Sequence, residues 1–354
     1  MHADAQLRRW LALPAPIGAS HVVLDELERV LRAFRELKRG EPETLHDFRV
    51  TVRRLRTLIR AYTNVLGETD AKRIQRVLKK VAHTTNAARD ADVHMEWLQS
   101  ERDGLRIAER WGADWLRNQL RRERQITEGD IDVVLSPKVH RALQRFRKRL
   151  RQLAATKPKR HDRKGEADTT PTLAAETADQ IRRLADELTR WLRTINAPDD
   201  VRALHSARIA AKHLRYVLEP LEEAELFPTL PPFMEKLVTL QTTLGDLHDT
   251  SVFADEIASY VSRASHEAAR QVAGAIRTHV TSDSATFHHA VAEAQLRDPV
   301  PGLVALTERL QSRHETGYER AQEEWLTNYA GVAMMPAYEL AGALDALVLH
   351  DTSR

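Results

Sequence analysis

Two stretches of the sequence carry a histidine followed by basic residues at helical spacing. The first, LHDFRVTVRRLRTLI, covers 45–59, and the second, LHSARIAAKHLRYVL, covers 204–218. Side chains that recur every three or four residues lie along one side of an α-helix, so each stretch predicts a row of cations. Arginine can donate two hydrogen bonds to one phosphate, and lysine adds a point charge, so both rows could bind phosphate groups. The candidate residues are His46, Arg49, Arg53, Arg54, Arg56, Arg60, His205, Arg208, Lys212 and Arg215.

Each row is predicted to flank a hydrophobic face of its own helix. At about 100° per residue, the apolar positions of each stretch fall on one continuous arc, which predicts the core face. Arg54 and His213 fall beyond the rows, on their far side. The predicted core residues are Leu45, Phe48, Val52, Leu55, Ile59 and Tyr62 in the first stretch, and Leu204, Ala207, Ala211, Leu214 and Leu218 in the second.

The first row contains no acidic residue to balance it. No Asp or Glu occurs from 48 to 64, although a solvated helix face normally alternates acids with bases four residues apart. Cations in line repel one another unless an anion lies on them. That anion is either a set of acids from a neighbouring helix or a bound polyanion. Asp90, Asp92 and Asp249 supply the first in part, but they are too few to neutralise both rows.

Further basic residues lie mostly in the N-terminal half of the chain. The segment 71–83 contains no acid, and 140–151 is also strongly basic, whereas the matching segment 232–244 keeps only Lys236. We therefore expect one continuous, asymmetric basic path with more charge from the N-terminal half. The additional candidates are Lys72, Arg73, Arg76, Lys79, Lys80, Arg141 and Arg145.

The two basic stretches are copies within one internal repeat. His46 recurs 159 positions later as His205, and the same offset carries Asp90 onto Asp249. One constant register over two separated motifs indicates a duplication rather than a chance match. Asp90, Asp92 and Asp249 are predicted to have structural roles, orienting the arginines or capping a helix, with Asp90 in the first turn of a helix at 87–103.

Composition favours an all-α protein. Charged residues make up 30% and aromatic residues 5%, and helical periodicity continues through most of the chain without a convincing strand. There is no cysteine and no run of 18 apolar residues, so we expect neither a thiolate site nor a membrane span. Residues 156–171 have the composition of a linker, and residues 1–20 that of a loose lead-in. The predicted helices are 20–39, 44–66, 69–84, 87–103, 105–127, 137–155, 173–195, 199–219, 232–244, 247–263, 265–283, 300–315 and 318–347, with a break at the prolines of 219–232.

The order LHDFRVTVRRLRT, RDADV, LHSARIAAKHLRYVLE and LQTTLGDLHDTSVF resembles the CHAD domain, the conserved histidine α-helical domain. The resemblance implies two helical bundles related by a pseudo-twofold axis, with a basic cleft or pore between them that binds inorganic polyphosphate. On this basis the CHAD domain is expected at 16–330, divided into bundles at 16–155 and 172–330, with a C-terminal helix and tail at 331–354. Glu219 matches the acid that closes the second signature of the family, and Arg60 stands near the corresponding place in the first copy.

Two other functions compete with polyphosphate binding. A nucleic-acid protein would use the same phosphate contacts, but it would add exposed aromatic or polar side chains for the bases. A metal-dependent phosphohydrolase is suggested by His46-Asp47 and His248-Asp249, yet neither pair survives the duplication, because the aligned residues are His205-Ser206 and Arg89-Asp90. Metal chelation by His46 and His205 is disfavoured by the arginines beside them.

We therefore expect a non-catalytic protein that binds polyphosphate, without catalytic residues, metal ligands or cofactors. Its expected partners are inorganic polyphosphate and proteins of polyphosphate granules. No membrane partner is expected, and nucleic acid remains the less favoured alternative ligand. The expected location is the cytoplasm, at polyphosphate granules, where the protein would target or organise the granule.

Overall fold

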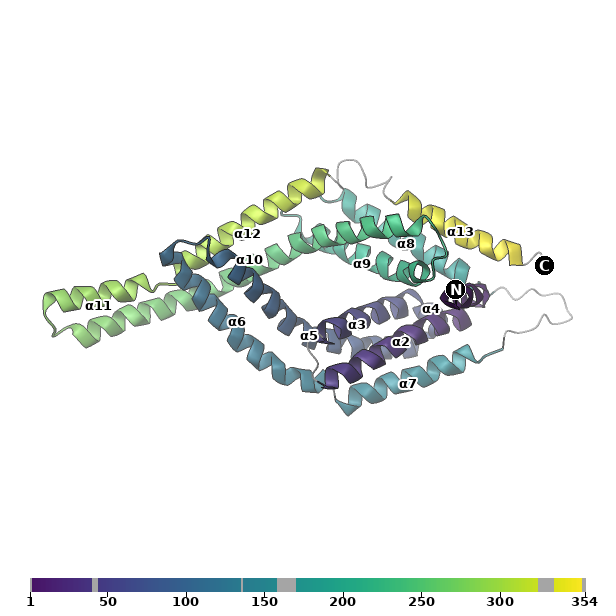
Figure 1. Ribbon diagram of the computed structural model, residues 1–354, viewed down its shortest axis with the longest axis horizontal. Helices are drawn as coiled ribbons and strands as arrows, with labels where there is room; N and C mark the ends of the chain where they lie inside the picture. Colours follow the sequence, from purple (N-terminus) through teal and green to yellow (C-terminus); the bar gives the residue numbers. More distant parts are fainter. Residues whose placement is uncertain (1, 40–43, 135, 158–169, 324–333, 352–354) are drawn as a thin grey trace. The chain divides into compact units, whose positions relative to one another are not determined.

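The computed structural model describes residues 2–39, 44–134, 136–157, 170–323 and 334–351. All regular structure in these ranges is helical, and no strand occurs in them, which confirms the all-α prediction (Figure 1). The helices are α1 His2–Ala12, α2 Ala15–Arg39, α3 Thr44–Ala61, α4 Thr63–Leu66, α5 Glu68–Arg102, α6 Ile107–Val134, α7 Pro137–Ala154, α8 Leu173–Arg193, α9 Val201–Glu223, α10 Leu230–His279, α11 Ser284–Leu296, α12 Val300–Ala321 and α13 Met335–Asp351.

Several predicted helix ends are wrong. The helices expected at 69–84 and 87–103 form the single helix α5, and three expected between 232 and 283 form α10. No proline interrupts either join, and a glycine inside a helix costs only about 1 kcal/mol, so helical hydrogen bonding continues through both. Asp90 is consequently in the middle of α5, and its predicted role in a first turn is wrong.

Two further departures concern the segment at 219–232 and the N-terminus. Helix α9 continues past Pro220 to Glu223, because Leu221 is buried against the core and offsets the lost backbone hydrogen bond. The expected lead-in is largely helical, since Leu7 and Leu11 are buried on one face of α1, which packs against α2.

The chain divides into two compact units, and the first contains both basic helices. Unit 1 comprises 1–86, 130–244 and 321–354. Within it, α2 packs against α3 and α7, α8 packs against α9 and α13, and α3 contacts α9. The predicted core faces of α3 and α9 are buried, with the exception of Leu45, which is half-buried. The rows therefore flank a packed hydrophobic seam, as their periodicity predicted.

The second unit comprises 87–129 and 245–320 and has its own core, to which α5, α6, α10 and α12 contribute. In this core the rings of His94 and Phe253 stack with centroids 3.7 Å apart and an angle of 9° between their planes. These two residues are 159 positions apart, so each contacts its own equivalent in the repeat. Such a contact is expected beside a pseudo-twofold axis, and it supports the duplication independently of the basic residues.

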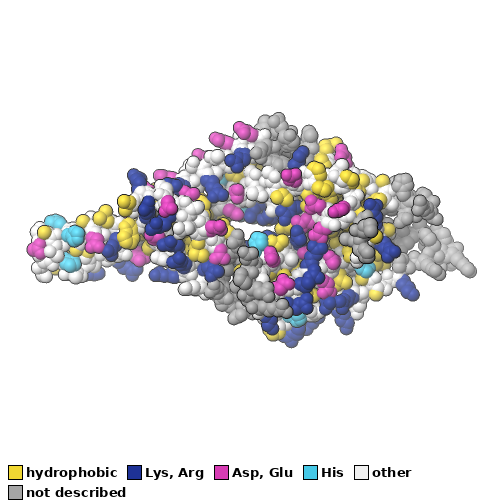
Figure 2. All heavy atoms as spheres, in the orientation of Figure 1, with side chains coloured by type: hydrophobic (Ala, Val, Ile, Leu, Met, Phe, Trp, Pro, Cys, Tyr) yellow, Lys and Arg dark blue, Asp and Glu magenta, His cyan; other side chains and the backbone are white. Residues whose placement is uncertain are grey.

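Both compact units draw helices from both sides of 156–171. They therefore do not coincide with the bundles expected at 16–155 and 172–330, and that division, with a basic cleft between the bundles, remains a prediction. Residues 158–169 of the expected linker lie outside the described residues. On the face shown in Figure 2, Lys and Arg side chains are interspersed with Asp and Glu, in keeping with a formal net charge of only +3.

Candidate polyanion site

The two predicted rows lie on two helices of the same unit that contact each other. On α3, His46 and Arg60 are exposed, Arg53 and Arg56 are half-buried, and Arg49 is only 8% exposed. On α9, His205 is exposed, and Arg208, Lys212 and Arg215 are half-buried. The tertiary structure thus brings the two copies of the basic motif together, although 159 residues separate them in the chain.

At one end of the α3–α9 contact, cations from both helices meet. This basic end is formed by Arg56, Arg60 and His213, with Lys212 nearby. The pKa of His213 is lowered to about 4, first by burial and then by the positive charges of Arg60, Arg56 and Lys212, in that order. His213 is therefore neutral at pH 7. The pKa of Arg56 is also lowered, first by burial and then by Arg60.

Two guanidinium groups at and beside the basic end have buried donors without an internal partner. In the described part of the chain, Arg53 Nε and Arg56 Nε are buried and make no hydrogen bond. The described residues also provide no ion pair for Arg56, Arg60 or His213. A buried donor without a partner costs about 1–3 kcal/mol, more when it is charged, so this region is suited to an anion from outside the chain.

His205 lies in the second row and is also less basic than a free histidine. Burial lowers its pKa, and the charges of Arg208 and Lys212 lower it further. Its imidazole is therefore suited to donate or accept one hydrogen bond in the row, while the permanent positive charge comes from the arginines and lysine.

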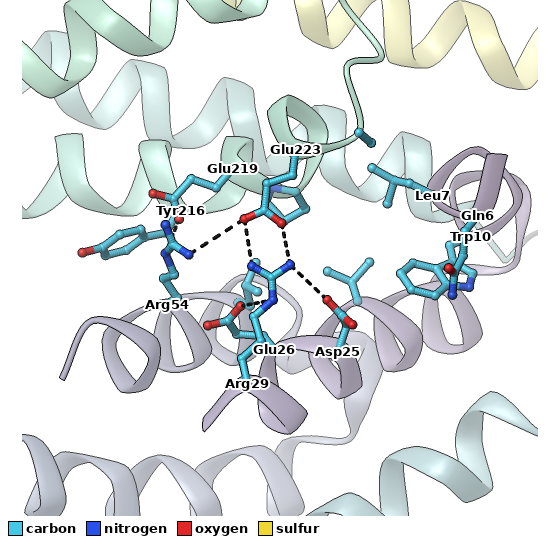
Figure 3. A pocket seen from close by; sticks show the side chains of 14 residues that line it. Gln6, Leu7, Trp10, Asp25, Glu26, Arg29, Arg54, Tyr216, Glu219 and Glu223 are labelled. Atoms are coloured by element: carbon cyan, nitrogen blue, oxygen red, sulfur yellow. Dashed lines mark hydrogen bonds and ion pairs between the residues drawn. The ribbon is translucent and has the colours of Figure 1, made fainter. Parts of the chain in front are cut away.

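At the opposite end of the contact, an acid lies between the two helices. Glu219 of α9 forms an ion pair with Arg54, whose Nε lies 2.7 Å from its Oε2. Its Oε1 accepts a hydrogen bond from Arg215 Nε at 3.1 Å. We call Arg54, Arg215 and Glu219 the acidic end. Arg54 also lies 3.8 Å from Glu223 Oε1. Two residues predicted to bind ligand, Arg54 and Arg215, therefore have carboxylate partners inside the protein. Figure 3 shows Arg54 beside Glu219 and Glu223.

The acidic end continues into helix α2. Arg29 donates to both carboxylate oxygens of Glu223, at 2.8 and 2.5 Å, and lies 3.3 Å from Asp25 (Figure 3). Glu26 is buried beside Arg29, and burial raises the pKa of its carboxyl to about 7, against the opposing effect of Arg29 and Arg54. These groups line a cavity of about 240 Å³. Periodicity along α3 did not reveal them, because they come from other helices.

The basic residues of α5 and α7 have varied surroundings. Lys72 pairs with Glu68, and Arg76 donates to the carbonyl of Lys72 at 3.3 Å, so both contact their own helix. Lys79 and Lys80 are exposed. Helix α7 packs on α2, and Arg141 donates to the carbonyl of Pro137 at 3.2 Å.

Arg73 and Arg145 share a small cleft between α5 and α7, of about 60 Å³. Asp70 lines the same cleft and pairs with Arg149 at 3.1 Å. The two arginines therefore have an acid beside them, which distinguishes them from the residues of the basic end.

The three predicted orienting acids belong to unit 2, and the rows belong to unit 1. Asp92 accepts Arg124 Nε at 2.5 Å, so it orients an arginine, though not one of the rows. Asp90 and Asp249 are exposed. Among the described residues, no three His, Asp or Glu side chains are grouped to hold a metal ion. None of the described helices is long and apolar enough to cross a membrane.

Comparison with known proteins identifies the class to which this helical fold and its paired basic motifs belong. The sequence model of the CHAD domain matches residues 21–258. The chain therefore belongs to the CHAD family, which is associated with polyphosphate binding.

Solved structures of this family have the same fold. The crystal structure of the CHAD domain from the plant Ricinus communis is 21% identical with a TM-score of 0.57, and the alignment covers 83% of this chain and 93% of the plant chain. PptA from Streptomyces chartreusis is 16% identical with a TM-score of 0.56, covering 86% of this chain and 99% of PptA. At these identities the two structures establish the fold alone. A comparison with curated protein sequences finds no match.

Proposed function

We propose that this protein binds inorganic polyphosphate without hydrolysing it, through the basic rows of α3 and α9. The observation that carries the proposal is the basic end, where Arg56 and Arg60 from one copy of the repeat meet Lys212 and His213 from the other. Mutual repulsion at this point is relieved by an anion that contacts both helices. Polyphosphate presents a charge at nearly every phosphate, so one chain can contact successive cations along both rows.

The surroundings of the rows favour polyphosphate over nucleic acid. The aromatic residues of the basic stretches are Phe48 on α3, Tyr62 directly after α3 and Phe146 on α7, and all three are at most 5% exposed. Tyr216 of α9 is 3% exposed. Unpaired bases are bound chiefly by stacking on accessible aromatic rings, which are not available here. Phosphate contacts alone suit a ligand that has no bases.

A binding role, rather than hydrolysis, agrees with the arrangement of the two His-Asp pairs. His46 and Asp47 lie on α3 in unit 1, and His248 and Asp249 lie on α10 in unit 2. Among the described residues, neither pair belongs to a group of three or more His, Asp or Glu side chains that could hold a metal ion. Binding at granules would then place the protein at stored polyphosphate, which is the role we propose for it in the cell.

A direct binding experiment tests the proposal. Labelled long-chain polyphosphate is titrated with the protein, and duplex DNA and RNA are added as competitors at the same salt concentration. We expect polyphosphate to bind more tightly than either nucleic acid, and binding to weaken steeply with salt as counterions are released. Preference for nucleic acid would overturn the proposal, and release of orthophosphate with added divalent metal would overturn its non-catalytic part.

A further inference from the structure

The 159-residue register relates the two ends of the α3–α9 contact residue by residue. Arg54 of the acidic end corresponds to His213 of the basic end, and Arg215 corresponds to Arg56. Glu219 corresponds to Arg60. The contact between Arg54 and Glu219 therefore has its repeat equivalent in the proximity of His213 to Arg60. The two ends are equivalent positions of one duplicated structure, and Glu219 and Arg60 are the pair with opposite charge.

The acidic end shows how an anion is held at such a position. The two oxygens of Glu219 contact one guanidinium group from each helix, at 2.7 and 3.1 Å. Glu219 is 8% exposed and lines the same cavity as Arg54. At the basic end, Arg56 provides the guanidinium that corresponds to Arg215, and the equivalent of the carboxylate is the exposed, positively charged Arg60.

We infer that Glu219 is an internal substitute for a ligand phosphate, which fills one of two equivalent anion positions and leaves the other, the basic end, to the ligand. This inference rests on the proposed function, since it assigns the ligand of the basic end to the same phosphate chain. Glu219 then limits how many phosphates the α3–α9 pair can bind. Glu219 competes with the ligand for Arg54 and Arg215. At the basic end, Arg60 stands where the carboxylate would be, so the anion position there stays open to the ligand.

Neutralising Glu219 tests the inference most directly. Glu219→Gln keeps the shape of the side chain and removes its charge, which frees Arg54 and Arg215 for a second stretch of phosphates. We expect affinity for long-chain polyphosphate to rise about tenfold, the value of one charge-assisted contact, with a steeper dependence on salt. Glu222→Gln on the same helix makes the same change in net charge and is the matched control, with no increase beyond about twofold.

The reciprocal change is made at the basic end. Arg60→Glu places a carboxylate where Glu219 lies in the other copy, next to Arg56, and Arg60 is exposed, so the fold tolerates the change. We expect polyphosphate affinity to fall more than about tenfold. In the double variant Arg60→Glu/Glu219→Arg, binding should return, because the open anion position is now the one beside Arg54 and Arg215. When Arg54→Gln or Arg56→Gln is added to this double variant, Arg54→Gln should therefore weaken binding more.

Crystals soaked in sulfate provide a readout that does not depend on affinity. We expect sulfate at Arg56 and Arg60 in the unaltered protein, and a second sulfate between Arg54 and Arg215 only in Glu219→Gln. The inference is overturned if Glu219→Gln folds normally, as judged by its melting temperature, yet shows unchanged affinity and salt dependence. If the unaltered protein does not bind polyphosphate at all, the proposed function itself has failed, and the two results are therefore distinguishable.

Discussion

The acidic end and the basic end of the α3–α9 contact arise from one repeated sequence, yet they have opposite electrostatic character. At the acidic end, the charges of Arg54 and Arg215 are balanced by Glu219 at hydrogen-bonding distance. At the basic end, the corresponding side chains face Arg60, and the pKa of His213 falls to about 4. The two ends differ in charge at two pairs of equivalent positions, since Glu219 corresponds to Arg60 and Arg54 corresponds to the neutral His213. In our proposal, this difference separates an internal ion-pair network from a position for an external anion.

The largest effect is expected from removing the charge of the basic end. Arg56→Gln and Arg60→Gln together should lower polyphosphate affinity at least about a hundredfold, because two charge-assisted contacts are lost. Isothermal titration at fixed salt measures the change. The control is Lys157→Gln/Lys159→Gln/Arg160→Gln, which removes more charge from the segment at 156–171. An equal loss in this control would mean that binding is diffuse over the basic surface and that the two ends do not differ.

A second prediction concerns the stability of the acidic end. Burial raises the pKa of Glu26 to about 7. The folded protein therefore retains the proton of this carboxyl at pH values where the unfolded chain, with the ordinary pKa of a glutamate, has already lost it. The stability that this proton contributes is complete at low pH and is lost as pH rises through about 7. Glu26→Gln should therefore raise the free energy of unfolding by roughly 1–3 kcal/mol at pH 8 relative to the unaltered protein.

Urea denaturation at pH 5 and pH 8 measures this difference in stability. The variant should gain little at pH 5, where Glu26 is protonated in the folded protein. A gain of the same size at both pH values would show that the amide improves packing and that the titration of Glu26 is not involved.

The third prediction uses the titration of His213 at the basic end. Its pKa of about 4 rises when a bound anion offsets Arg60 and Arg56, so binding is accompanied by proton uptake. Polyphosphate affinity should rise about fivefold more between pH 7.5 and pH 5.5 in the unaltered protein than in His213→Gln. Titrations in buffers of different ionisation enthalpy detect the proton directly. Identical pH profiles would place the ligand away from His213.

In the protein without bound polyphosphate, acid pH makes His213 lower the stability of the fold. Because its folded pKa is lowered, the unfolded chain takes up a proton first, and stability decreases as pH falls from about 6.5 towards 4. His213→Gln should remove this part of the acid sensitivity in the absence of polyphosphate.

The smallest effect is expected in unit 2, outside both ends. Asp92→Asn breaks the partly exposed pair with Arg124, which should lower stability by about 0.5 kcal/mol and leave polyphosphate affinity unchanged. Thermal denaturation and the same titration measure both quantities. A clear loss of affinity would give the aspartate a part in the site that its contact with Arg124 does not account for.

Prediction from sequence was most accurate where neighbours along one helix decide the outcome. The core seam at Phe48, Val52 and Leu55 followed from a period of 3.6 residues, and burial confirms it. The continuity of α5 and α10 did not follow from the sequence, because weak helix formers at the predicted ends do not stop a helix where no proline does. The candidate site residues themselves stay predictions, and the structure adds which of them meet and which already have partners.

Sequence alone determined that this chain is all-α, that it belongs to the CHAD family and that it carries two cationic rows in constant register. The tertiary structure decided which cations in and beside the rows have an internal acid: Arg54 and Arg215 have Glu219, while Arg60 lies near His213. The physical reason is that electrostatic energy depends on distance through space, and more than 150 residues separate Arg54 from Glu219 along the chain. Periodicity places a side chain on a face of its helix, and packing alone determines what that face contacts.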